Sequence, residues 1–205
     1  MRRRARPNRA SPANLKGMPT AYIGMGANLP SVAGPPEATL AAAASRLAQF
    51  GAIGARSHLY QTKPVGLADQ PDFVNAVLAL ETDLEPRRLL NELHAIERAY
   101  GRNRDIEIRY GPRSLDLDIL LFGSAVLREA GLEIPHPRMF ERAFALVPLR
   151  EIAPDFRDPN TGLSVTQWVE RLFPVDDYAH LEVIPIESRL WRPDAAWDAG
   201  RHGEP

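Results

Sequence analysis

The sequence predicts an α+β sandwich, in which an antiparallel β-sheet has helices packed on it. Segments with the two-residue period of strands alternate with segments of helical period, in the order strand, helix, strand, strand, helix, strand, followed by further helices. The chain has 205 residues, 44% of them hydrophobic, so it is long enough for one domain with a full core.

Each element occupies a defined part of the chain. Apolar runs bounded by turn residues predict strands, and the Ala-rich segment after Pro36 and the segment that begins at Pro86 predict helices. Strands are expected at residues 20–25, 53–61, 73–81 and 114–122, and helices at residues 36–50, 86–100, 141–150 and 163–172. This split order resembles a ferredoxin-like sandwich with the helices on one face of the sheet.

Apolar stripes indicate the buried face of two helices. The stripe of the first helix consists of Leu40, Ala44, Leu47 and Ala48. The stripe of the second consists of Leu89, Leu90, Leu93 and Ile96, with Glu97 at or beside its edge.

Three regions of the chain differ in composition. Residues 1–18 have no apolar period and no acidic residue, so a disordered basic tail is expected there. Met18 directly precedes the first strand and is an alternative start of the protein. Residues 19–174 form the expected folded domain, and residues 175–205 form an extension whose pattern predicts no definite structure.

Composition excludes several kinds of protein. Without cysteine, disulfides, thiolate catalysis and cysteine-ligated zinc are excluded, and a cytoplasmic location is expected. No apolar run reaches the ~20 residues of a membrane span. Six of the 25 basic residues lie in the tail, so 19 remain against 26 acidic residues, a net charge of −7. A body this acidic does not attract nucleic acid, and a polyanionic ligand must meet a local basic cluster.

The strand at residues 114–122 contains two carboxylates in an apolar setting. Asp116 and Asp118 project from one face, about 7 Å apart, and the opposite face consists of Leu115, Leu117, Ile119 and Leu121. Neighbouring carboxylates repel each other and lose solvation there, so a cation is needed. A divalent metal bound to phosphate oxygens fits this need. The alternative is a solvated edge strand, which the apolar run after Asp118 disfavours.

Basic and amide side chains accompany these carboxylates. Guanidinium groups on the loop at residues 101–113 suit phosphoryl oxygens, although a solvated loop in an arginine-rich chain is the alternative. His136, fixed between two prolines, can donate to a phosphate oxygen. Asn75 lies on an apolar strand face and is either structural or a contact for a planar polar ligand. The arginines of the loop are Arg102, Arg104, Arg109 and Arg113.

An acidic pair on a strand next to an arginine-rich loop predicts phosphoryl transfer from a nucleotide, in which metals and cations neutralise charge on phosphate oxygens. The common nucleotide folds are excluded. Gly24-Met25-Gly26 lacks the third glycine of a dinucleotide site, and the chain contains no P-loop or protein-kinase motif.

Four blocks in order carry a family resemblance. Residues 26–29 (GANL), 69–82 (DQPDFVNAVLALET) and 111–123 (GPRSLDLDILLFG), together with Pro135-His136, resemble the 6-hydroxymethyl-7,8-dihydropterin pyrophosphokinases of folate synthesis. The resemblance covers about residues 20–172. It implies a diphosphotransferase that moves the terminal diphosphate of ATP to the pterin's hydroxymethyl oxygen and releases AMP.

The resemblance also implies roles for individual residues. Asp116 and Asp118 match the aspartates that hold two Mg²⁺ ions, and Arg102 and Arg113 match arginines that engage the phosphates during transfer. Nucleotide contacts are implied for Glu97, Arg104, Arg109, Tyr110, Ile119, His136 and Arg142. Pterin contacts are implied for Thr62, Lys63, Val65, Phe73, Asn75, Tyr110 and Phe144, with Phe73 and Phe144 on either side of the ring.

The sequence also departs from the family pattern. Tyr110 stands where bacterial members commonly have Trp, Lys63 where proline is frequent, and Ala27 where serine is. The arginine loop is one residue longer, which leaves the individual matches of Arg104 and Arg109 open.

The expected partners are ATP and the dihydropterin, with neither nucleic acid nor membrane, and the expected state is a monomer. Two alternatives remain. One is another Mg²⁺-dependent nucleotidyl or phosphoryl transferase, and the other is a non-enzymatic RNA-binding ferredoxin-like module that uses the basic tail.

Overall fold

The computed structural model describes residues 17–104, 108, 110–173 and 182–193. Its main sheet has the strand order β5-β1-β4-β3-β8, with β2 also paired to β4, and every pairing is antiparallel. The strands of this sheet are β1 (Thr20–Ala27), β2 (Ala52–Arg56), β3 (Leu59–Thr62), β4 (Phe73–Glu81), β5 (Asp116–Phe122) and β8 (Val183–Ile186). A two-stranded sheet pairs β6 (Leu127–Glu129) with β7 (Leu132–Ile134). The predicted α+β sandwich is confirmed.

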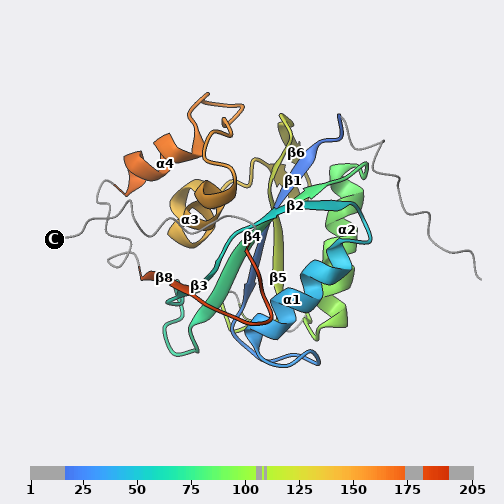
Figure 1. Cartoon of the computed structure of the whole chain (residues 1–205), viewed down its shortest axis with the longest axis vertical. Helices are drawn as coiled ribbons and strands as arrows, with labels where there is room; N and C mark the ends of the chain where they lie inside the picture. The colour runs from blue at the N-terminus through green and yellow to red at the C-terminus, as the bar shows by residue number, and fades with distance from the viewer. Residues whose placement is uncertain (1–16, 105–107, 109, 174–181, 194–205) are drawn as a thin grey trace, which may run out of the picture.

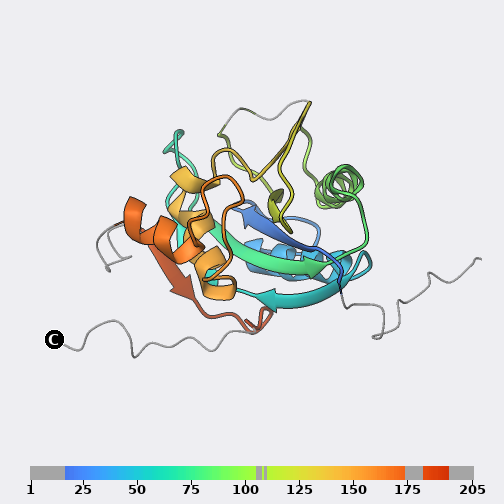
Figure 2. The same cartoon turned by 90° about the horizontal axis from the view of Figure 1, so that it is seen from above.

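Helices cover both faces of the main sheet (Figures 1 and 2). On one face, α1 (Pro36–Leu47) and α2 (Pro86–Ala99) pack against β1, β4 and β5 in the larger core cluster. On the other face, α3 (Ala143–Ile152) and α4 (Val165–Leu172) form a second cluster with Val77 and Leu120. The 3₁₀ helix η2 (Met139–Glu141) leads into α3. The expected one-sided arrangement therefore holds for the first two helices, and α3 and α4 cover the opposite face.

The strand expected at residues 53–61 is divided into β2 and β3. Ser57 lies at the break, where its hydroxyl accepts a hydrogen bond from Val77 N at 2.9 Å and donates one to His58 O at 2.7 Å. At this point the hydroxyl of the buried Ser57 takes the place of a backbone acceptor for β4. The two short strands therefore pair with different parts of β4. Helix α1 is also shorter than expected, and Ala48 is an exposed C-cap residue rather than part of the buried stripe.

The alternation expected along β5 fails at Leu121. The register shifts between the pairs Tyr22–Leu121 and Ile23–Ile119, so Leu120 is an extra residue, as in a β-bulge. Leu120 and Leu121 therefore both pack in the cluster of α3 and α4, whereas Leu117 and Ile119 face α1 and α2. The two aspartates precede the bulge and keep the predicted common face.

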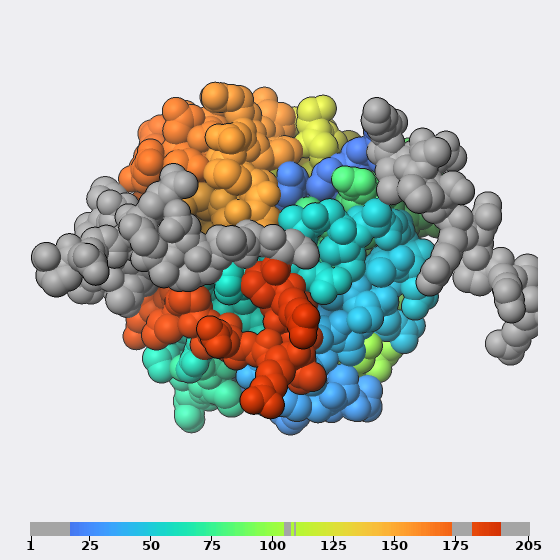
Figure 3. All heavy atoms as spheres, in the orientation of Figure 1, coloured from blue at the N-terminus to red at the C-terminus, as the bar shows by residue number. Residues whose placement is uncertain are grey.

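The described part of the C-terminal extension belongs to the main sheet, although its sequence pattern predicted no structure there. β8 is the outer neighbour of β3, and Trp191 is 3% exposed in the larger core cluster. The space-filling view shows this segment against the middle of the molecule (Figure 3). The expected tail at residues 1–18 lies almost wholly outside the described residues. Among those described, no helix is both long enough and apolar enough to cross a bilayer.

Candidate functional site

A cavity of about 350 Å³ lies on the sheet face that carries α3. Its floor comes from β1, β4 and β5, its sides from β3, α3 and the segment around His136, and the loops before β4 and β5 border it. The cavity brings together most of the predicted site residues: Thr62, Lys63, Val65, Phe73, Asn75, Arg102, Arg104, Tyr110, Arg113, Asp116, Asp118, His136, Arg142 and Phe144.

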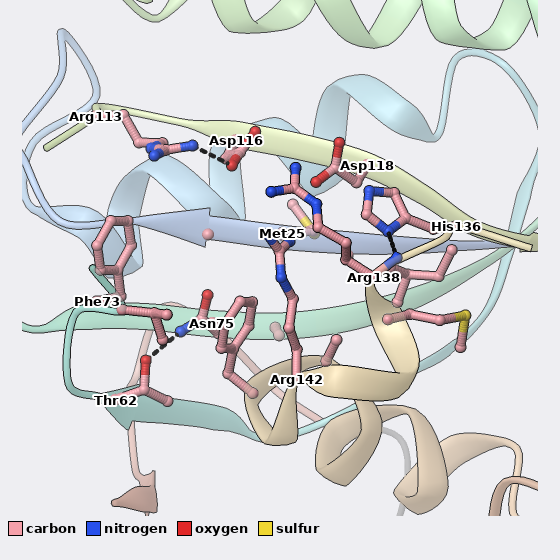
Figure 4. A pocket seen from close by; sticks show the side chains of 18 of the residues that line it. Met25, Thr62, Phe73, Asn75, Arg113, Asp116, Asp118, His136, Arg138 and Arg142 are labelled. Carbon is pink, nitrogen blue, oxygen red and sulfur yellow. Dashed lines mark hydrogen bonds and ion pairs between the residues drawn. The ribbon is translucent and has the colours of Figure 1, made fainter. Parts of the chain in front are cut away.

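Asp116 and Asp118 form an acidic pair on β5 (Figure 4). The two carboxylate oxygens of Asp116 are paired with Arg102 and, at 2.7 Å, with Arg113. Burial acts to raise the pKa of Asp116, but these two guanidinium groups outweigh it and the pKa is lowered. Burial and the neighbouring carboxylates of Asp116 and Glu97 raise the pKa of Asp118 to about 7.

Glu97 organises the arginines from behind the cavity wall. Its side chain is 1% exposed, and it accepts hydrogen bonds from the guanidinium groups of Arg102 and Arg104 and from Leu117 N at 2.9 Å. Burial raises the pKa of Glu97, although these donors act against it. The carboxylate thus connects the end of α2, the arginine loop and β5 from a position outside the cavity lining.

His136 is held as a neutral imidazole at the far end of the acidic pair. Its backbone N–H donates to Leu120 O at 2.9 Å, so the β5 bulge anchors it, and its Nδ1 accepts from Arg138 N at 3.2 Å. Burial, followed by Arg142 and Arg138, lowers the pKa of His136 to about 4. With Nδ1 acting as the acceptor, Nε2 carries the proton and is available to a ligand oxygen.

The other end of the cavity is lined by a polar pair, Thr62 and Asn75, and by the aromatic rings of Phe73 and Phe144. Asn75 Nδ2 donates to Thr62 Oγ1 at 2.7 Å, and both residues are buried, which leaves Asn75 Oδ1 facing the cavity (Figure 4). A Cβ on Gly26 would lie 2.8 Å from that oxygen. Any larger residue at position 26 would therefore have to displace the Asn75 amide from its place beside Thr62. The guanidinium carbons of Arg113 and Arg142 lie 5.8 and 5.4 Å from the ring centroids of Phe73 and Phe144, respectively.

Three loops around the cavity meet at a hydrogen-bonded pair, Asn28 and Gln70. Asn28 Nδ2 donates to Gln70 Oε1 at 3.0 Å and to Pro71 O at 2.9 Å, and Asn28 Oδ1 accepts from Arg113 N at 2.7 Å. Gln70 Nε2 in turn donates to Tyr110 O at 2.8 Å. The pair therefore joins the loop after β1, the loop before β4 and the arginine loop.

Tyr110 occupies a conformation that few residues of its kind adopt, with φ of 63°. Its ring contacts Gly66, where an added Cβ would lie 3.2 Å from the ring, and its hydroxyl accepts from Arg138 Nη1 at 3.3 Å. Lys63 is paired with Asp72 at 3.0 Å, so it bridges the start and end of the loop before β4.

The remaining predicted residues lie elsewhere. Ile119 is buried against α1 and α2, so its side chain faces away from the cavity, and Arg109 lies outside the described residues. Sequence reasoning missed Met25, Gly26, Ile108, Arg138 and Met139 in the lining, and it gave no role to Asn28 and Gln70. The Gly-x-Gly turn and the Pro-Arg step after His136 were the available signals for Gly26 and Arg138.

The donor set fits a hard divalent cation that also binds phosphate. The described residues contain no group of three or more metal-ligating side chains, so Asp116 and Asp118 would supply only part of a coordination shell and leave room for phosphate oxygens. Among the described residues, none forms an ion pair with Asp118, and burial with the carboxylates of Asp116 and Glu97 raises its pKa more than Arg142 and Arg102 lower it. Five arginines and Lys63 also line the cavity, which suits a polyanion.

Residues 22–154 match the family model for 7,8-dihydro-6-hydroxymethylpterin-pyrophosphokinase. This match spans more than half of the chain. The chain belongs to this pyrophosphokinase family. Relatives named 2-amino-4-hydroxy-6-hydroxymethyldihydropteridine pyrophosphokinase agree with the assignment. The Haemophilus influenzae protein is 44% identical over 156 residues, which are 75% of this chain and 93% of the relative. The Pseudomonas aeruginosa protein is 50% identical over 141 residues, which are 68% of this chain and 83% of the relative.

Solved structures support the fold of a pyrophosphokinase domain. The crystal structure of wild-type Plasmodium falciparum HPPK-DHPS matches 79% of this chain with a TM-score of 0.57 and 14% sequence identity. This chain spans about half, 48%, of that longer chain. At this identity the likeness concerns the fold alone, and it agrees with the ferredoxin-like arrangement predicted from the order of elements.

Proposed function

We propose that this pyrophosphokinase-family chain transfers the terminal diphosphate of ATP to the hydroxymethyl oxygen of 6-hydroxymethyl-7,8-dihydropterin, a step of folate synthesis. The observation that supports this most directly is the division of one cavity into two ends. The Thr62–Asn75 pair between Phe73 and Phe144 suits a flat polar ring, and the Asp116–Asp118 end with its arginines suits a triphosphate.

The pterin end supplies orientation. Asn75 Oδ1 would accept a hydrogen bond from the edge of the pterin, while Thr62 fixes the amide by accepting from its nitrogen. Phe73 and Phe144 would hold the two faces of the ring. Because Gly26 leaves the space in front of Asn75 open, the ring can reach the amide. The hydroxymethyl group would then point toward the β-phosphorus of ATP.

The phosphate end supplies charge neutralisation. Asp116 and Asp118 would hold two Mg²⁺ ions, which supply Lewis-acid shielding of the triphosphate oxygens when bound. Arg113 and Arg102 would leave Asp116 for phosphate oxygens, and the neutral His136 would donate Nε2–H to another. Arg142 would add a further cationic contact with the nucleotide, next to Phe144.

The reaction forms a bond between the hydroxymethyl oxygen and the β-phosphorus and breaks the bond from that phosphorus to the oxygen bridging it to the α-phosphate. AMP leaves with that oxygen, and the hydroxyl proton passes to solvent or to phosphate. His136 has a pKa of about 4 and is a weak base. We therefore assign most of the rate to positioning and charge neutralisation, with the loops at residues 62–71 and 101–113 closing over the substrates. We also propose that the protein is a monomer and that it acts in the cytoplasm. The absence of cysteine is compatible with a reducing compartment.

The deciding experiment incubates the full chain with ATP, Mg²⁺ and the dihydropterin and measures AMP. We expect AMP and pterin diphosphate in equal amounts, with no AMP when the pterin or the metal is omitted. Consumption of ATP without a pterin requirement would favour a different phosphoryl or nucleotidyl transferase. RNA affinity that disappears on deletion of residues 1–17, in a chain without turnover, would favour a binding module.

A further inference from the structure

The C-terminal segment at residues 183–191 lies beyond residues 22–154, which match the family model, yet it is built into the main sheet. β8 pairs with all four residues of β3, from Leu59 opposite Ile186 to Thr62 opposite Val183. Without β8, β3 would be a four-residue edge strand that pairs only with β4. Such an edge leaves backbone N–H and C=O groups unpaired and is less firmly held.

Trp191 anchors the far end of the segment. The indole is 3% exposed, and its Nε1–H donates to Ser57 O at 2.7 Å. The guanidinium carbon of Arg56 lies 5.9 Å from the indole centroid. Ser57 lies at the break between β2 and β3, two residues before β3 begins. The C-terminal segment is therefore bound to the chain just before β3, at Ser57, and to the end of β3, at Thr62.

The Thr62 end of β3 leads to the pterin end of the cavity. Thr62, opposite Val183, is the partner of Asn75, and the neighbouring residue pair across β3 and β4 is Tyr60 with Asn75. Val183 is 3% exposed and forms a small apolar cluster with Tyr60 and Val147 of α3. Val147 lies one helical turn after Phe144. The segment thus contacts β3, which carries Thr62, and the part of α3 that follows Phe144.

Among the described residues, the acidic pair of the phosphate end is not part of the cluster around Val183, whereas Arg142 is the neighbour in sequence of Ala143, which packs against that cluster. Asp116 and Asp118 are on β5, at the opposite edge of the strand order β5-β1-β4-β3-β8. A change in β8 should therefore affect the pterin end of the cavity more than the acidic pair.

We propose that residues 183–191 are a positioning element for the pterin subsite, which holds β3 and α3 so that Thr62, Asn75 and Phe144 keep the geometry for a flat ring. This inference rests on the proposed function. It gives the extension a role in substrate selection at one end of the cavity, distinct from general stabilisation of the fold.

The test uses Val183→Ala and Trp191→Phe in the full chain. Val183→Ala removes the side chain behind Tyr60, and Trp191→Phe keeps an aromatic ring but loses the donor to Ser57 O. In steady-state kinetics we expect the KM for the pterin to rise by about 3- to 30-fold, the range of energetic coupling through packed residues. The KM for ATP should change by less than about twofold, within the scatter of distant sites.

The matched control is Ile184→Thr, on the same strand but with a side chain that is 53% exposed and outside the Tyr60 cluster. Both KM values should remain at their wild-type levels in this control. Thermal unfolding is measured in parallel, and kinetics are run well below each transition. If Val183→Ala does not fold, Trp191→Phe carries the test.

Variants that unfold at lower temperature but keep the wild-type pterin KM would overturn the inference, because they would show a merely structural role. An equal rise in both KM values would overturn it as well. Failure of the proposed function is distinguishable from either outcome, since the wild-type chain would then release no AMP with any pterin concentration.

Discussion

Asp116 and Asp118 lie two residues apart on the same face of β5, yet their pKa values move in opposite directions. Burial acts on both carboxyl groups. Asp116 is paired with Arg102 and Arg113, and these cations lower its pKa. Asp118 is half-buried beside the carboxylates of Asp116 and Glu97, and loss of solvation together with these charges raises its pKa to about 7. The first aspartate is stabilised by the protein itself, and the second is left for a ligand cation.

The two aspartates should therefore respond oppositely to removal of their charge in the metal-free protein. Asp118→Asn should raise the free energy of unfolding at pH 8 by about 1–3 kcal/mol, because the folded state no longer holds a carboxylate whose charge is disfavoured by burial and by two neighbouring carboxylates. Asp116→Asn should lower it by about 1–3 kcal/mol, because Arg102 and Arg113 lose a partly buried partner. Both variants should lose about 10²- to 10³-fold in Mg²⁺-dependent kcat. Denaturant unfolding in EDTA and kinetics with Mg²⁺ measure the two effects.

The pH dependence has a defined sign for Asp118. Between its ordinary pKa of 3.8 and about 7, the folded protein keeps a proton that the unfolded chain has released. The free energy of unfolding of the wild type should therefore fall as the pH rises through this window, relative to Asp118→Asn. Asp155→Asn, at an exposed position after α3, is the control for the loss of a carboxylate elsewhere on the chain. A destabilised Asp118→Asn protein would contradict the assignment.

Gly26 should be irreplaceable at the pterin end of the cavity. In Gly26→Ala the new methyl group would lie 2.8 Å from Asn75 Oδ1, so the amide must move away from its place beside Thr62. We expect kcat/KM for the pterin to fall by about 10²-fold, the cost of a misplacement of about 1 Å. The KM for ATP should change little. Gly54→Ala, on β2 of the same sheet, meets Glu81 Oε1 at an ordinary 3.6 Å and is the matched control.

The hydrophobic periodicity of the sequence was sufficient to predict the elements whose burial follows a regular pattern. The strand at residues 73–81 coincides with β4, and the helix predicted from Pro86 ends within one residue of α2. Three features were not predictable because they depend on contacts distant in sequence. Ser57 divides β2 from β3 through its bonds with β4, the β5 bulge follows from pairing with β1, and β8 is a strand only beside β3.

The residues of the site likewise fall into those with a local sequence signal and those that depend on contacts distant in sequence. Asp116, Asp118, Arg113 and Asn75 could be singled out because each residue type is unusual in its local pattern, and the family resemblance added the aromatic walls. Asn28 and Gln70 have no such local signal. Their role arises only where three loops approach one another, which no spacing along the sequence reveals.

Asn28 and Gln70 should be energetically coupled. Asn28 is 3% exposed, and Asn28→Ala would leave Arg113 N and Pro71 O without their side-chain partners, at a cost of about 2–3 kcal/mol in unfolding free energy. Gln70→Ala should cost about 1 kcal/mol. The double variant should cost less than the sum by about 0.5–1.5 kcal/mol, measured by a double-mutant cycle with denaturant. Gln49→Ala, exposed at the end of α1, should give strictly additive changes with Asn28→Ala. Additivity of Asn28→Ala with Gln70→Ala would show that the loops are held independently.

His136 should remain uncharged throughout the working pH range. Its pKa is lowered from 6.5 to about 4, so between these values the unfolded chain takes up a proton that the folded protein does not. The free energy of unfolding should consequently fall as the pH drops from 6.5 toward 4, and His136→Gln should lack this loss, a difference of about 1–3 kcal/mol at pH 4.5. NMR of the imidazole should show titration near pH 4 and a proton on Nε2, because Nδ1 accepts from Arg138 N. Since the glutamine amide can replace the Nε2–H donor, His136→Gln should retain more of kcat than His136→Ala. An imidazole that titrates near pH 6.5, or equal loss of kcat in both variants, would contradict the role of a neutral donor.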